Sequence, residues 1–91
     1  MDKELMSQME KLLEEIIYSP TKSNAKKPIT RLRSLASQIR PNINSYAAEK
    51  LSQAIGYADS ASGCIDKKEH WANNANQAWY LFEREVDFKE E

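Results

Sequence analysis

The stretch that decides the fold runs from Tyr46 to Val86 and reads YAAEKLSQAIGYADSASGCIDKKEHWANNANQAWYLFEREV. Its first half places small residues and one leucine at helical spacing: Ala47, Leu51, Ala54, Ala58 and Ala61. Its second half places bulkier residues and two alanines at the same spacing: Trp71, Ala75, Ala78, Trp79, Phe82 and Val86. A turn near Gly63–Asp66 would set the small ridge against the bulky one, as a close-packed core requires. The stretch therefore predicts an antiparallel pair of helices.

Upstream of this pair, hydrophobic periodicity predicts further helices. A broad apolar stripe from Leu5 to Ile17 indicates a first helix over 2–18, and Pro20 ends it because proline disfavours helix at the residue before it. The segment 19–27 is polar and basic, so we expect a mobile loop there. Pro28 suits the first turn of a helix over 28–40, since its missing N–H would be unpaired there anyway.

These elements predict an all-α fold, a small antiparallel bundle of four helices at about 2–18, 28–40, 44–62 and 67–86. The chain has 91 residues, which makes a single domain spanning 1–91. The predicted core consists of Leu5, Met9, Leu12, Leu13, Ile16, Leu32, Leu35, Ile39, Leu51, Ala54, Ile55, Ala58, Trp71, Ala75, Trp79, Phe82 and Val86.

Cysteine content and hydropathy indicate where the chain resides. Cys64 is the only cysteine, so it has no partner for an intramolecular disulfide. No apolar run in the sequence reaches the roughly 18–20 residues that a membrane-spanning helix needs. We therefore expect a cytoplasmic protein with no membrane contact.

Catalytic and metal-binding constellations are hard to assemble from this composition. His70 is the only histidine and lies six residues after Cys64, so a zinc site would lack its remaining ligands. A nucleophilic cysteine–histidine pair would need a shaped cleft and an oxyanion hole, for which no glycine-rich scaffold is present. We expect no enzyme activity, no cofactor and no metal.

The charge is segregated along the chain although the net charge is only −1. Between Ile16 and Ala48 there is no acidic residue, whereas the segment carries six basic ones. Five of these are candidates for binding phosphates or an acidic protein: Lys26, Lys27, Arg31, Arg33 and Arg40. The alternative is a solvated surface whose arginines pair with neighbouring acidic helices.

Two rows of polar and aromatic residues are further candidates for partner binding. One row on the third predicted helix consists of Tyr46, Lys50 and Tyr57. The other lies on the outward side of the fourth: Asn73, Gln77, Tyr80 and Arg84. Tyrosine and arginine are enriched at protein interfaces, and amides supply adaptable hydrogen bonds.

The leading interpretation is a non-catalytic protein-binding domain, a stoichiometric regulator or inhibitor of the kind that bacteria and phages encode as short chains. The partner would be a protein, of acidic character if it meets the basic segment, and the same surfaces could support homo-oligomers. The alternative is nucleic-acid association through the basic segment 22–40, against which the acidic first helix and tail argue. Which face binds, and which partner, stay open at this point.

Overall fold

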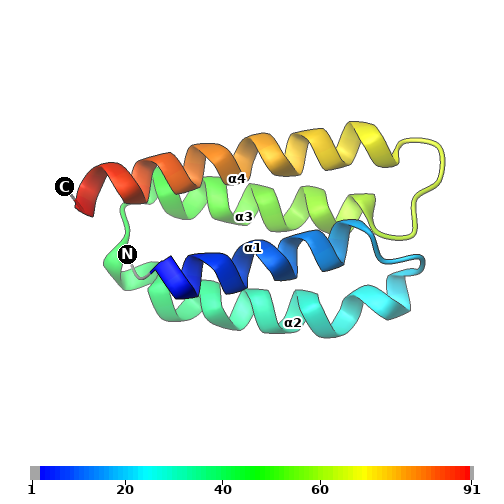
Figure 1. The fold of residues 1–91 in the computed structure, drawn as a ribbon, viewed down its shortest axis with the longest axis horizontal. Coiled ribbons are helices and arrows are strands. Elements are labelled where there is room, and N and C mark those ends of the chain that lie inside the picture. The colour runs from blue at the N-terminus through cyan, green and yellow to red at the C-terminus, as the bar shows by residue number, and fades with distance from the viewer. Residues whose placement is uncertain (1–2, 91) are drawn as a thin grey trace.

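The computed structural model describes residues 3–90 of the chain, and the side chains of residues 3–86. Its elements are α1 (Lys3–Ile17), α2 (Lys22–Ile39), the 3₁₀ turn η1 (Arg40–Asn42), α3 (Ser45–Ala61) and α4 (Lys68–Glu90). Successive helices run in opposite directions along the long axis of the molecule, which measures 40 Å (Figure 1). The predicted all-α antiparallel bundle is confirmed.

The α3–α4 pair forms the packing centre of the bundle. α3 contacts each of the other three helices, and α4 lies along it (Figure 1). The small ridge of α3 is buried throughout: Ala47, Leu51, Ala54, Ala58 and Ala61. Most of the facing ridge of α4 is buried as well: Ala75, Ala78, Trp79, Phe82 and Val86. Small side chains on one helix leave room for large ones on the other, which explains the close contact.

α1 and α2 complete the core from the other side. Every predicted core residue is either buried or packed against the buried cluster, the half-buried ones being Leu5, Leu12, Leu35 and Trp71. Two buried serines were not predicted, Ser19 and Ser62. Each satisfies its hydroxyl on a nearby backbone carbonyl, since Ser19 Oγ donates to Glu15 O and Ser62 Oγ to Asp59 O, both at 2.6 Å.

The predicted loop over 19–27 and the predicted start of the second helix at Pro28 are wrong. α2 begins at Lys22, and Thr21 caps it by accepting a hydrogen bond from the Asn24 backbone N–H at 3.1 Å. Ala25 is fully buried, so this first turn is anchored in the core. Pro28 lies inside the helix, where it lacks the N–H for the carbonyl one turn earlier and its ring crowds that carbonyl.

The other helix ends lie close to their predicted positions, with one exception. α4 continues to Glu90, four residues beyond the predicted end at Val86, because no glycine or proline follows Val86 to stop it. The predicted first residue of the first helix, residue 2, and the last residue of the acidic tail, Glu91, lie outside the described residues.

The two hairpin connections meet at the end of the bundle opposite the termini (Figure 1). The Gly63 N–H donates to the Ser19 carbonyl at 3.0 Å, which joins the α3–α4 connection to the α1–α2 connection. Lys68 Nζ donates to the carbonyls of Ile17 and Ala61, the last residues of α1 and α3. A lysine near a helix C-terminus can donate to the last carbonyls, which have no partner within the helix, and its charge interacts favourably with the negative end of the helix dipole. Lys68 therefore stabilises two helix ends at once.

Candidate protein-binding surfaces

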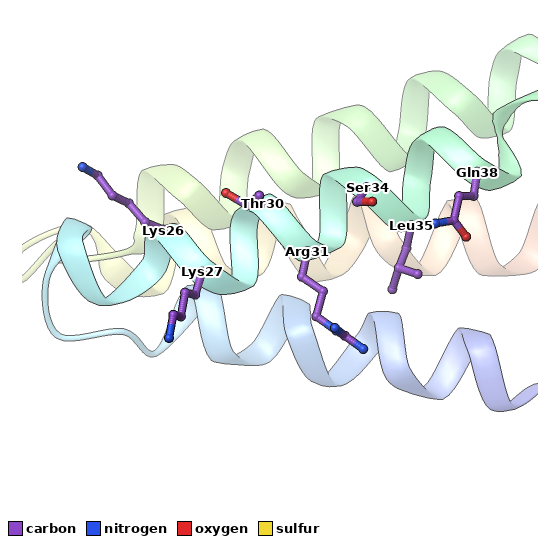
Figure 2. Close-up of a pocket in the computed structure, with 7 residues that line it drawn as sticks. All are labelled: Lys26, Lys27, Thr30, Arg31, Ser34, Leu35 and Gln38. Atoms are coloured by element: carbon purple, nitrogen blue, oxygen red, sulfur yellow. The ribbon is translucent and has the colours of Figure 1, made fainter.

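The five basic candidates are all exposed, and they lie on α2 and the turn that follows it. They divide between two sides of that segment. Lys26, Lys27 and Arg31 line an open hollow on the outer side of α2, together with Thr30, Ser34, Leu35 and Gln38 (Figure 2). All these residues belong to one helix, so the hollow is the space between its long side chains and not an enclosed cavity. Arg33 and Arg40 instead line a groove between α2 and α3.

No ion pair neutralises these five side chains within the described part of the chain. The ion pair that α2 does form there joins Lys22 Nζ to Asp59 Oδ1 at 3.7 Å, and Lys22 also donates to the Asp59 carbonyl. Lys22 is therefore occupied in holding α2 against α3. The described acidic side chains of α1 and α3 do not pair with the arginines of α2, so the cationic surface of α2 is available to a ligand.

Tyr46, Lys50 and Tyr57 share one flank of α3, but their surroundings differ. Tyr46 is exposed, and Lys50 Nζ lies 5.4 Å from the centre of its ring, within cation–π range. Lys50 also donates to Gln53 Oε1 at 3.3 Å, so its side chain is held over the flank. Tyr57 is half-buried because its ring stacks on Trp71 with centroids 6.0 Å apart. Tyr57 therefore belongs partly to the core.

Asn73, Gln77, Tyr80 and Arg84 all lie exposed on the outward side of α4, where the periodicity placed them. Tyr80 exposes 56% of its surface, so much of its ring meets water. We call these four residues the α4 outer row. Burying Tyr80 against a partner would remove this apolar surface from water.

The tertiary structure joins the two predicted rows at one point. Tyr46 from α3 and Arg84 from α4 line the same hollow, together with Leu81 and Glu85. Asn44 secures this end of the hairpin, since its Oδ1 accepts from the Ala47 N–H at 2.8 Å while its Nδ2 donates to Glu85 Oε1 at 2.7 Å. The residues on this shared flank are called the α3–α4 face: Tyr46, Lys50, Tyr57, Trp71, Leu81, Arg84 and Glu85.

Sequence reasoning missed three members of this site, Leu81, Glu85 and the exposed side of Trp71. Trp71 was assigned to the core, but its ring is half-buried and meets the edge of His70 at 4.9 Å. The turn predicted near Gly63–Asp66 sets the start of the third predicted helix against the end of the fourth, which could have placed Glu85 and Leu81 beside Tyr46. No single-helix pattern could have done so, because the contact joins two helices.

The histidine and the cysteine of this chain are not part of the surfaces described above. His70 is exposed, and its Nε2 lies 3.4 Å from Asn74 Nδ2 on the same helix. Cys64 is a free, half-buried thiol in the α3–α4 connection. Among the residues that the structure describes, no group of three His, Cys, Asp or Glu side chains is arranged to hold a metal ion.

The chain matches no family model, no curated protein and no solved structure. Within residues 3–90, none of the helices has the length and apolar character needed to cross a membrane. The fold places the chain in the class of small antiparallel four-helix bundles. Such a fold can carry many functions, so the function depends on the residues at its surfaces.

Proposed function

We propose that this chain is a non-catalytic protein-binding domain that regulates or inhibits one partner stoichiometrically, in a reducing, cytoplasmic setting. The observation that supports the proposal best is the continuity between the α3–α4 face and the α4 outer row through Arg84. This surface combines exposed tyrosines and an arginine, residue types that concentrate binding energy at protein interfaces, with a leucine that adds apolar area.

The arrangement of this surface favours recognition over catalysis. Its charged groups, Lys50, Arg84 and Glu85, lie on an open flank, and Lys50 and Glu85 are already engaged by Gln53 and Asn44. Side chains braced in this way present a defined shape to a partner and lose little conformational entropy on binding. Tyr46 and Tyr80 supply rigid apolar area with a hydroxyl at the rim, which suits a partly wet interface.

The test is an affinity capture with immobilised protein in lysate of the cells that naturally contain the chain. Three baits are compared: wild type, the variant Tyr46→Ser/Tyr80→Ser/Arg84→Ser, and a control on α1, Gln8→Ser/Lys11→Ser/Glu14→Ser, whose three positions are exposed. Wild type and control should enrich one protein in near-equal amount to the bait, and the first variant should retain about tenfold less. Equal recovery on all baits, or capture of no protein, would contradict the proposal.

A second candidate function is nucleic-acid association through the outer side of α2. The observation that favours it is the set of unpaired cations around the open hollow, Lys26, Lys27 and Arg31, which the hydroxyl-bearing Thr30 and Ser34 also line (Figure 2). Such side chains suit phosphate contacts that carry no sequence information. Gel shifts at low salt with random duplex and single strands test it, because each phosphate neutralised on a duplex steepens the log–log salt dependence by about 0.9. A shift that Lys27→Glu/Arg31→Glu leaves unchanged would remove this hollow from consideration.

A further inference from the structure

A groove between α2 and α3 is separate from the surfaces assigned above. It has a volume of about 250 Å³ and is lined by Arg33, Ala36, Ser37, Arg40, Ser52 and Ile55. Arg33 lies on α2 and Arg40 is the first residue of η1, but Arg40 keeps α-helical φ and ψ and its N–H donates to the Ala36 carbonyl. The two arginines, seven residues apart, therefore follow one line and are separated by about 10 Å along the helix axis. Both are exposed, and neither pairs with an acidic group among the described residues. Two free guanidinium groups therefore border a floor that is apolar at Ala36 and Ile55.

The neighbouring side of α3 carries almost no side-chain bulk. Ser52, Gly56 and Ser60 are exposed and follow one another at four-residue spacing, so they lie on one side of the helix. A Cβ atom added at Gly56 would meet nothing within 4 Å, which shows that no described part of this chain approaches it. A glycine inside a helix costs roughly 0.5–1 kcal/mol relative to alanine, and no contact within the fold explains it here. A ligand backbone could lie directly against this strip of Ser52, Gly56 and Ser60, because position 56 has no side chain to hold it away.

We propose that this groove docks an acidic α-helix of a protein partner. Two carboxylates at positions i and i+7 of that helix would repeat the spacing of Arg33 and Arg40, and its backbone would pass over Ser52 and Gly56. Arginine suits this role because its planar guanidinium group binds a carboxylate through two parallel hydrogen bonds. The inference rests on the proposed protein-binding function and adds a second contact, with defined chemistry, to it.

The surroundings of the groove favour a protein helix over a nucleic-acid strand. Glu49 is exposed on α3 one turn before Ser52, and its charge would repel any anion placed beside it, so a ligand with an anion at every residue is disfavoured. A helix can instead present isolated carboxylates with small apolar residues between them, which matches cations at both ends of an apolar floor. The three cations on the outer side of α2 lie outside this groove and supply an internal control.

The experiment is an NMR titration of ¹⁵N-labelled protein with synthetic, alanine-based helical peptides. One peptide carries glutamates at i and i+7, the second carries glutamines there, and the third carries glutamates at i and i+4. The first should shift the amides of Ser52 and Gly56 and bind at least about fivefold more tightly than the other two. Arg33→Gln/Arg40→Gln should weaken its binding about tenfold, and Gly56→Leu, which fills the strip, should weaken it similarly.

The matched control is Lys27→Gln/Arg31→Gln, which removes the same charge from the same helix outside the groove and should leave binding within about twofold of wild type. Equal losses in the two double variants, or no shift at Ser52 and Gly56, would overturn the inference. A random single-stranded oligonucleotide that shifts these amides at lower concentration would overturn it in favour of nucleic acid. Concentration-dependent shifts there without peptide would overturn it in favour of a second copy. The lysate capture tests the α3–α4 face, whereas the NMR titration tests the α2–α3 groove. Each experiment can therefore contradict its own proposal without contradicting the other.

Discussion

At the scale of single residues, the two glycines of this chain have opposite roles. Gly63 follows Ser62 (φ −64°, ψ 132°) with a φ of +67°, and the Cys64 N–H donates to the Ala61 carbonyl at 3.1 Å. These values describe a type II turn, in which the third residue needs a positive φ. Gly63 is also where the two connections touch, since a Cβ atom at this position would lie 3.1 Å from the backbone nitrogen of Lys22. The turn predicted near Gly63–Asp66 is therefore confirmed at its first residue, which adopts the left-handed conformation.

Replacing each glycine by alanine separates the two roles. Gly63→Ala should lower the free energy of unfolding by about 1–2 kcal/mol, because an L-residue is strained at positive φ and its Cβ would crowd the start of α2. Gly56→Ala is the control and should raise it by roughly 0.5–1 kcal/mol, since the added methyl meets only solvent in a helix interior. Urea denaturation followed by far-UV circular dichroism measures both. Equal midpoints for the two variants would contradict the assigned turn.

At the scale of elements, α2 shows how a proline can mislead sequence reasoning. Pro28 would fit a first helical turn, yet the structure places six helical residues before it. Thr21 and Asn24 make this possible, because the Thr21 side chain accepts from the Asn24 N–H while its hydroxyl donates to Asn24 Oδ1 at 2.6 Å. The buried Ala25 then ties the first turn to the core. The start of α2 therefore depends on the cap, the buried Ala25 methyl group and the contacts of Lys22 with Asp59.

Thr21→Ala tests where α2 begins. Loss of the cap should cost about 1 kcal/mol and should speed hydrogen exchange at the amides of residues 25–27. Thr30→Ala, an exposed threonine in the same helix, is the control and should change stability by less than about 0.5 kcal/mol. If the helix began at Pro28 instead, the amides of residues 25–27 would already exchange at unprotected rates in the wild type.

At the scale of the whole molecule, stability is concentrated in the seam between α3 and α4. Trp79 is buried, its ring centre lies 5.1 Å from that of Phe82, and no described residue accepts a hydrogen bond from its indole nitrogen. Its contribution is therefore apolar burial and packing, uncompensated by a polar contact. A chain of 91 residues has few other side chains of this volume to replace it.

Trp79→Ala should accordingly lower the free energy of unfolding by about 3–5 kcal/mol, a large share of the total for a domain of this size. The adjacent Tyr80→Ala provides a control of similar chemistry, because Tyr80 points outward and should cost less than about 1 kcal/mol. Urea melts of the two variants give the comparison. A Trp79→Ala protein as stable as the wild type would show that the seam does not carry the core.

The sequence by itself determined the parts of this protein that depend on one helix at a time. The spacing of small and bulky residues predicted the α3–α4 pair, and the same periodicity predicted the exposed α4 outer row. These predictions succeeded because helical period and side-chain size set which side of a helix can be buried. The partner-binding role of those residues stays a prediction.

Only the tertiary structure decided how the helices combine their surfaces. It placed Arg84 beside Tyr46, divided the basic residues between the outer side of α2 and the α2–α3 groove, and brought Lys68 to the ends of two helices. Each of these outcomes depends on the rotation and register of one helix against another. The whole core sets that geometry, because its side chains must fill space together, and no local pattern in the sequence encodes it.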